Sequence, residues 1–189
     1  MKSSISNIIN SSKQIIFNPK LFWIEKKEDL KSQSKLLLGY LLPLIIVVAV
    51  AKFIGEFLRS SDFYMETALL KMLRIIILFL LQYFISVFFT NKLIKTFGGE
   101  KNIDISRNIV VFSLTPFLLV SIVTGLFPFL YVIEILGLYS FYIFWIGVRK
   151  LLTFPENKQL KFTILAVVVN FIIFSFLSIS LSKLMNFFY

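Results

Sequence analysis

Residues 108–150 read NIVVFSLTPFLLVSIVTGLFPFLYVIEILGLYSFYIFWIGVRK, and this stretch decides the fold of the chain. Apart from tyrosines, Glu134 is the single ionisable side chain in its apolar part. The stretch is about twice as long as the roughly 20 residues that a transmembrane helix needs to cross a bilayer. Gly125-Leu126-Phe127-Pro128 contains the residues that end helices, and it divides the stretch into two arms. We therefore predict a tight helical hairpin inside a membrane.

The rest of the chain extends this pattern to an all-α, polytopic membrane protein. Its 189 residues are 58% hydrophobic, above the 45–50% of ordinary soluble domains, and the mean hydropathy is +0.86. We expect residues 1–35 to form a cytoplasmic interfacial segment and residues 36–189 to form one transmembrane domain. The five predicted spans are 36–58, 68–90, 108–127, 129–148 and 162–185.

The basic residues predict the orientation in the membrane. The formal net charge is +10, which in a soluble protein would suggest nucleic acid. Here the Lys and Arg side chains flank apolar segments, so they indicate topology instead. The first 35 residues hold seven Lys and no long apolar run, so we expect no cleaved signal. The N-terminal segment and the loops after the second and fourth spans lie on one side of the membrane and together hold fifteen basic residues. The other side of the membrane holds five. We predict a cytoplasmic N-terminus, an outside C-terminus and contact between the inner face and anionic headgroups.

Enzyme chemistry is not indicated by the residue inventory. The chain contains no Cys and no His, and its ten acidic residues are dispersed. No Gly-rich phosphate loop and no Gly-x-Ser-x-Gly sequence occur. We expect no catalytic residues, no cofactor and no metal site.

The N-terminal segment leaves two interpretations open. Isoleucines recur at roughly helical spacing through residues 1–17, which fits either an amphipathic helix on the membrane surface or a frayed tail. Asn18-Pro19 is typical of a helix start. Phe22 and Trp23 precede a charged run and are predicted to anchor the segment at headgroup depth.

Five charged residues fall inside or beside the predicted spans: Glu134, Lys71, Arg74, Lys52 and Glu56. Charges in a bilayer are costly and point to function or to ion pairing. Lys52 and Glu56 lie four residues apart and can pair on one helix face. We predict that Glu134 pairs with Lys71 or Arg74. The alternatives for Glu134 are a substrate or proton site, and an isolated carboxylate that reaches the outer surface.

The predicted spans also contain prolines and uncharged polar residues. Pro43 and Pro116 are predicted to kink their helices, and the kink at Pro116 serves either packing or gating. Thr115 is expected to bond a carbonyl freed by that kink. Gln82 and Asn170 are expected to make hydrogen bonds between helices. Ser121 and Gly125 form a small-x-x-x-small pair that favours close helix approach.

Four short motifs resemble the Yip1-domain family of small five-span membrane proteins. In order, they are Asn18-Pro19-Lys20 with Phe22-Trp23, Phe112-Ser113-Leu114-Thr115-Pro116-Phe117, Leu138-Tyr139-Ser140-Phe141-Tyr142 with Gly147, and Phe154-Pro155-Glu156-Asn157-Lys158. The resemblance implies five helices with a cytoplasmic N-terminus. Eukaryotic members work in vesicle traffic and contact Rab GTPases, and they carry long acidic or proline-rich N-terminal regions. The short, net-basic tail here is more similar to the short bacterial members, which implies a bacterial cytoplasmic membrane. The resemblance supplies no catalytic residues.

Two functions follow as expectations. The first is a non-enzymatic membrane-organising or assembly factor that acts through helix packing and its basic cytoplasmic face. Its expected partners are membrane lipids and a protein, either another chain or a further copy of this one, and not nucleic acid. The alternative is a small transporter or lipid-translocating protein that uses the outer-half charges around Glu134. A transporter requires a polar cavity lined by Glu134, whereas an assembly factor requires a filled bundle.

Overall fold

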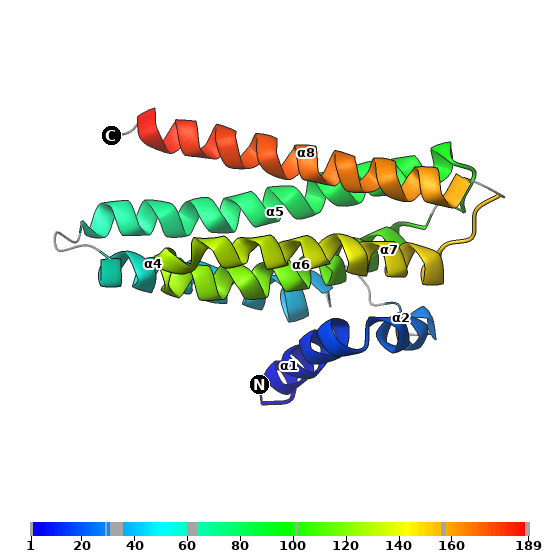
Figure 1. The fold of residues 1–189 in the computed structure, drawn as a ribbon, viewed down its shortest axis with the longest axis horizontal. Helices are drawn as coiled ribbons and strands as arrows, with labels where there is room; N and C mark the ends of the chain where they lie inside the picture. The colour runs from blue at the N-terminus through cyan, green and yellow to red at the C-terminus, as the bar shows by residue number, and fades with distance from the viewer. Residues whose placement is uncertain are drawn as a thin grey trace.

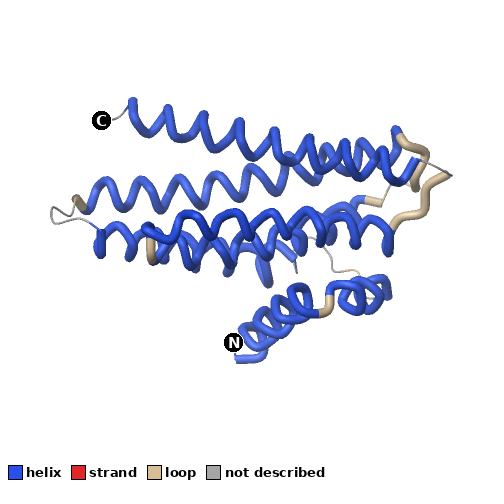
Figure 2. Tube along the Cα trace, viewed as in Figure 1, coloured by secondary structure: helices blue, strands red, loops and turns tan. Residues whose placement is uncertain are grey.

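The structure is a computed structural model, and it describes residues 2–28, 30, 36–59, 64–100, 102–155 and 158–187. The described residues form helices joined by short loops (Figure 2). Five helical segments within them are long and apolar enough to cross a membrane. This confirms the predicted all-α, five-span class. The charged run predicted over residues 25–35 lies partly outside the described residues.

The elements follow one another with little intervening chain. They are α1 (Lys2–Phe17), α2 (Pro19–Glu28), η1 (Leu37–Leu41), α4 (Leu42–Arg59), α5 (Met65–Thr96), α6 (Ile103–Leu126), η2 (Pro128–Leu138), α7 (Tyr139–Leu151) and α8 (Lys158–Phe187). The helices α5 and α8 extend past the predicted spans because their polar ends remain helical. Helix α2 begins at Pro19, and the predicted hairpin turn separates α6 from η2.

Helix α6 is the centre of the bundle. It contacts α1, α4, α5, η2 and α7, whereas α8 packs mainly on α5 and less on α7. In Figure 1, α8 and α5 lie above α4, α6 and α7, and the two N-terminal helices lie beneath. The most apolar window of α6 is 61% buried inside the protein, against 11% for that of α8. Most of α8 therefore faces the surroundings, which for a membrane protein are lipid.

Glycines allow a close approach of the α4 and α6 backbones. A Cβ added at Gly55 on α4 would lie 1.8 Å from the carbonyl oxygen of Gly125 on α6. Gly125 and Ser121 are both buried in this contact region. The small-x-x-x-small pattern of α6 thus meets a glycine of α4, which the sequence analysis did not single out.

Helices α1 and α2 form an N-terminal arm that docks on the bundle. Trp23 is fully buried, and its Nε1 donates a hydrogen bond to the carbonyl of Ile143 at 3.2 Å. Its ring sits against Gly147, where an added Cβ would come within 2.8 Å of the indole. Phe22 packs edge-on against Phe112 of α6. The structure corrects the expected headgroup anchors, because both rings contact protein and are covered by it.

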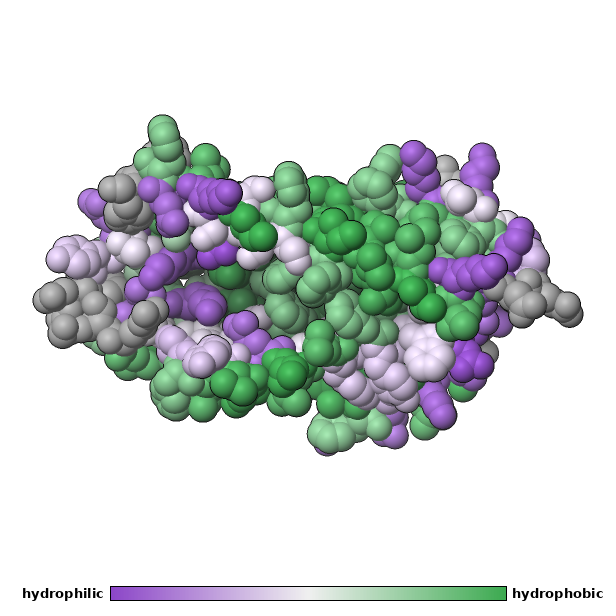
Figure 3. All heavy atoms as spheres, turned by 45° about the horizontal axis from the view of Figure 1, so that its top comes forward, coloured by the Kyte–Doolittle hydropathy of each residue, from purple (hydrophilic) through white to green (hydrophobic). Residues whose placement is uncertain are grey.

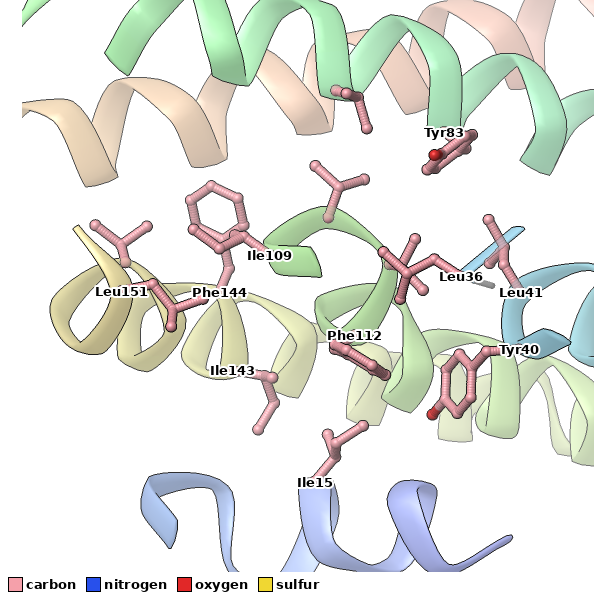
Figure 4. Packing of buried hydrophobic residues seen from close by; sticks show 14 of the residues in the cluster. Ile15, Leu36, Tyr40, Leu41, Tyr83, Ile109, Phe112, Ile143, Phe144 and Leu151 are labelled. Carbon is pink, nitrogen blue, oxygen red and sulfur yellow. The ribbon is translucent and has the colours of Figure 1, made fainter. Parts of the chain in front are cut away.

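The first arm helix also reaches the core. In Figure 4, Ile15 points from α1 toward the rings of Phe112 and Tyr40. The phenol of Tyr139 donates to the carbonyl of Ile16 at 3.0 Å. Residues Lys2–Phe17 are thus helical and packed on the bundle, and the position of this helix at the membrane surface stays a prediction.

Each predicted kink position has a local adaptation of the backbone. Pro43 follows η1, a π-helical turn in which the Leu42 N–H bonds the Leu37 carbonyl five residues back. A π-helical turn is wider than an α-helical turn. It therefore leaves room for the ring of Pro43, which in a regular α-helix would clash with the preceding turn. Helix α6 continues through Pro116, and the N–H of Phe117 donates to Oγ of Ser140 at 3.1 Å.

The segment after the hairpin turn differs from the predicted α-helix. Residues Pro128–Leu138 form a 3₁₀ helix, η2, which passes into α7 at Tyr139. A 3₁₀ helix has 3.0 residues per turn, so side chains three apart are aligned. Glu134 and Gly137 therefore lie on one face of η2, and Ser140 follows in the first turn of α7.

The surface matches a membrane environment. Figure 3 shows a broad hydrophobic face across the middle and hydrophilic side chains toward both ends. Large apolar side chains of η2 are exposed, among them Phe129 at 74% and Tyr131 at 69%. Exposed apolar area of this extent is expected where lipid, not water, is the neighbour.

Candidate functional site: a largely apolar cavity between α5, α6, α7 and α8

A cavity of about 130 Å³ lies between the α5–α8 pair and the η2–α7–α6 side of the bundle. Its walls are largely aromatic, with Phe117, Phe141, Phe144, Phe171 and Phe174 among them. Figure 3 shows a hollow bordered by hydrophilic side chains in the half of the molecule that carries the C-terminus. The cavity is comparable in size to engineered apolar cavities that admit benzene.

Polar side chains of α5 and α8 meet at this cavity. Gln82 Nε2 donates to Ser86 Oγ at 2.9 Å and to the Asn170 carbonyl at 3.3 Å. Asn170 Nδ2 donates to the Ala166 carbonyl at 2.7 Å and contacts Thr90 Oγ1 at 3.4 Å. The two amides predicted to bond between helices thus lie together on one side of the cavity.

Glu134 reaches the cavity from the opposite side. Its Oε1 accepts a hydrogen bond from Thr124 Oγ1 at 3.2 Å. Glu134 and Gly137 of η2 and Ser140 of α7 all line the cavity. Gly137 is needed there, because an added Cβ would lie 2.5 Å from the ring of Phe117. The predicted ion pair of Glu134 with Lys71 or Arg74 is corrected by this geometry, since η2 directs the carboxylate toward α6.

The other charged residues of this half form separate contacts. Lys71 pairs with Glu56 across the α4–α5 packing, in place of the expected contact between Glu56 and Lys52. Arg74 Nη2 donates to the carbonyl and the hydroxyl of Ser178, each at 3.2 Å, and so ties α5 to α8. Lys71, Arg74 and Glu134 therefore each bond a different partner. Which charged side chains pair depends on the rotation of each helix about its axis. The position of a residue along the chain does not define this rotation.

A chain of hydroxyls occupies the opposite side of α6. Thr115 Oγ1 lies 3.0 Å from the Tyr40 hydroxyl, which lies 3.1 Å from Ser12 Oγ. Thr115 thus bonds a side chain of η1, and the expected bond to a freed carbonyl is replaced. Tyr40 and Ser12 were not predicted, because residues 28 and 75 positions apart in the sequence carry no local signal of contact.

Two further residues of the cavity escaped the sequence analysis. Ser113 lies on α6 beside the cavity, and Ser140 lies on α7. Serines are frequent in membrane helices, so the sequence gives no reason to select these two. The available signal is the three-residue spacing of positions 134, 137 and 140, which places polar or small residues on one side of a helix.

Exposed cations gather at one end of the bundle, here called the basic end. It comprises the end of α5, the end of α7 and the start of α8, with Lys92, Lys95, Arg149, Lys150, Lys158 and Lys161. Asp104 of the same end is engaged by Arg107 at 2.8 Å. Within the described residues, no group of three or more acidic side chains could hold a metal ion.

These features define a multi-pass integral membrane protein with five apolar helices around a central α6. The family model described as the Yip1 domain matches residues 13–179, and the chain therefore belongs to the Yip1 domain family. This confirms the resemblance that the motifs indicated. The comparisons with curated proteins and with solved structures gave no match.

Proposed function

We propose that this protein is a non-enzymatic membrane-organising or assembly factor whose basic end binds anionic lipid headgroups on the cytoplasmic side of a bacterial cell membrane. The observation that supports this function is the gathering of exposed Lys and Arg at one end of the bundle. Each cation near an anionic surface contributes about 1 kcal/mol of attraction. The arm adds exposed Lys20 and Lys27 close to α7.

The docked arm supports a role in assembly. Trp23 and Phe22 hold α2 on α6 and α7, so the arm presents its charged side chains from a fixed position. A fixed basic surface can orient both lipid and a protein partner, which is either another chain or a further copy of this one.

Retention of lipid by the purified protein tests the proposal. The protein is reconstituted in nanodiscs that mix phosphatidylcholine with phosphatidylglycerol, then extracted, and the retained lipid is quantified by mass spectrometry. We expect enrichment of phosphatidylglycerol, and its loss when Lys92, Lys95, Lys158 and Lys161 are changed to Gln. The matched control is Lys183→Gln at the opposite end of α8. Equal lipid composition in all three proteins would refute the proposal.

A second candidate, a small transporter or lipid-translocating protein, is favoured by one observation. The bundle contains a cavity lined by Glu134 and Gln82, which a filled assembly factor does not need. Because the chain has no Cys, Gln82→Cys can be labelled selectively by a membrane-impermeant thiol reagent. Labelling of this position in intact cells would favour transport, and protection would favour the assembly factor.

A further inference from the structure

Helix α1 packs on the bundle at the level of its apolar interior. Ser12 of α1 bonds the Tyr40 hydroxyl, which in turn bonds Thr115 of α6. Thr115 lies eight residues beyond Arg107, the last charged residue of α6, and therefore about 12 Å further along that helix. Figure 1 shows α1 against the flank of the bundle, with its N-terminus beneath the middle of the long helices.

A second hydrogen bond gives a similar depth. The phenol of Tyr139 donates to the carbonyl of Ile16 in α1. Tyr139 begins α7 ten residues before Arg149, the first charged residue of that helix, which corresponds to about 15 Å. The bundle side of α1 thus contacts the apolar part of the transmembrane helices.

The opposite side of α1, its outer face, is polar. This face contains the exposed side chains of Ser6, Asn10, Lys13 and Gln14, and it points away from the side of the buried Ile15. Ser6, Asn10 and Gln14 follow one another at intervals of four residues and so form one row along the helix.

Lipid is a poor neighbour for the outer face. Every exposed residue between Ile164 and Ile179 of α8 is apolar, as expected for a helix that faces lipid. Amide and ammonium groups in hydrocarbon lose the hydrogen bonds that water supplies, and in membrane proteins they pair with one another instead. A polar partner is therefore expected to cover α1.

The composition of the outer face determines which partner fits. Asn, Gln and Ser side chains each contain a donor and an acceptor, so the row is complementary to a copy of itself. An anionic headgroup would require several cations, and Lys13 is the one cation among the described side chains of α1. A twofold axis along the membrane normal keeps both copies in the same orientation, and it can place Asn10 of one copy against Asn10 of the other.

We propose that two copies of this protein pair through the outer face of α1, with the row of Ser6, Asn10 and Gln14 at the centre of the contact. The inference rests on the proposed role in assembly and names its partner, a second copy of this chain. It does not depend on lipid binding at the basic end.

Cross-linking in membranes tests the contact. The chain has no Cys, so each variant carries a single thiol. A short bismaleimide should trap a dimer of Asn10→Cys and should leave Ile172→Cys, whose parent residue is 57% exposed on α8, as a monomer. Absence of a dimer with Asn10→Cys, or an equal yield from both variants, would overturn the proposal.

Access of water to α1 distinguishes a second copy from lipid headgroups. A membrane-impermeant maleimide is added to membranes opened by freezing and thawing, so that it reaches both sides. We expect slow labelling of Asn10→Cys, because the second copy covers it, and fast labelling of Lys27→Cys, which is an exposed position of α2. Equally fast labelling of the two thiols would mean that α1 faces water and headgroups, against the proposal.

A variant without the central amide separates pairing from folding. Asn10→Leu should weaken the dimer by about tenfold or more in detergent, measured by energy transfer between labelled copies on dilution. Its Tm under monomeric conditions should equal that of the parent protein, because Asn10 is exposed. Ile9→Leu is the matched control and should keep the dimer. An unchanged dimer in Asn10→Leu would refute the contact. Lipid retention is measured on the same proteins and reports on the basic end alone, so each proposal fails separately.

Discussion

Gly55 is the residue at which the smallest change should have the largest structural effect. The backbones of α4 and α6 touch there, and an added Cβ would lie 1.8 Å from the carbonyl oxygen of Gly125. No rotamer can relieve this clash, because the opposing atom belongs to a helix backbone. The two helices must separate, and the packing around Ala51 must open with them.

We predict that Gly55→Ala lowers the stability of the bundle by about 1–3 kcal/mol or more, as overpacking of a tight contact does. Thermal unfolding in detergent measures the change. The control is Gly39→Ala in η1, where an added Cβ meets nothing within 4 Å. Equal stability of the two variants would contradict the close crossing.

Trp23 is the second residue with a large expected effect. It has no exposed surface, bonds the Ile143 carbonyl and packs on Gly147. Removal of a fully buried Trp side chain costs about 3–5 kcal/mol. We predict that Trp23→Ala releases the arm and speeds trypsin cleavage at Lys13, Lys20 and Lys27, which are exposed.

Limited proteolysis followed by mass spectrometry locates these cleavages. Trp145→Ala is the control, since Trp145 is 41% exposed on α7 and lies outside the arm contact. If Trp23→Ala accelerates cleavage equally at Lys92 and Lys95, the whole bundle has loosened and the arm is not a separable unit.

At the scale of elements, a hydrogen bond joins α6 to α7 next to a proline. Pro116 has no backbone N–H, and the N–H of the next residue, Phe117, donates to Ser140 Oγ at 3.1 Å. The same serine lines the cavity together with Glu134 and Gly137. The bond thus ties the first turn of α7 to α6.

We predict that Ser140→Ala destabilises the bundle by about 1–3 kcal/mol, because a backbone donor loses its partner. Ser140→Thr keeps a hydroxyl and should restore most of the stability. Thermal unfolding of both variants, with Ser180→Ala on the exposed face of α8 as control, checks this. A neutral Ser140→Ala variant would mean that Phe117 has another acceptor.

At the scale of the whole molecule, charge is distributed unevenly between the two ends. Exposed cations concentrate at the basic end, and the opposite end carries the Lys71–Glu56 pair. An excess of Lys and Arg marks the cytoplasmic side of membrane proteins. The arm lies on the α6–α7 side of the bundle, and α8 ends away from the basic end (Figure 1).

We predict that the N-terminus is cytoplasmic and that the C-terminus lies outside. In intact cells, a membrane-impermeant thiol reagent should label Asn186→Cys and should leave Lys20→Cys unlabelled until the membrane is opened. The reverse pattern would place the basic end outside and remove its proposed contact with inner-leaflet lipid.

The sequence by itself determined the number of spans, the hairpin after Gly125, the start of α2 at Pro19 and the family. These are consequences of long apolar runs, of residues that end helices and of short motifs, all of which are local in the chain. The tertiary structure decided which groups meet. Glu56 bonds Lys71 of the next helix, Trp23 is covered by α7, and Gln82 shares a cavity with Glu134.

The physical reason is that burial and pairing depend on the rotation of each helix about its axis. Hydropathy gives the length of a span and leaves this rotation open. For Glu134 the deciding contact was the hydrogen bond from Thr124 of α6, across the hairpin turn. The cavity that Glu134 shares with Gln82 became visible only in the folded molecule.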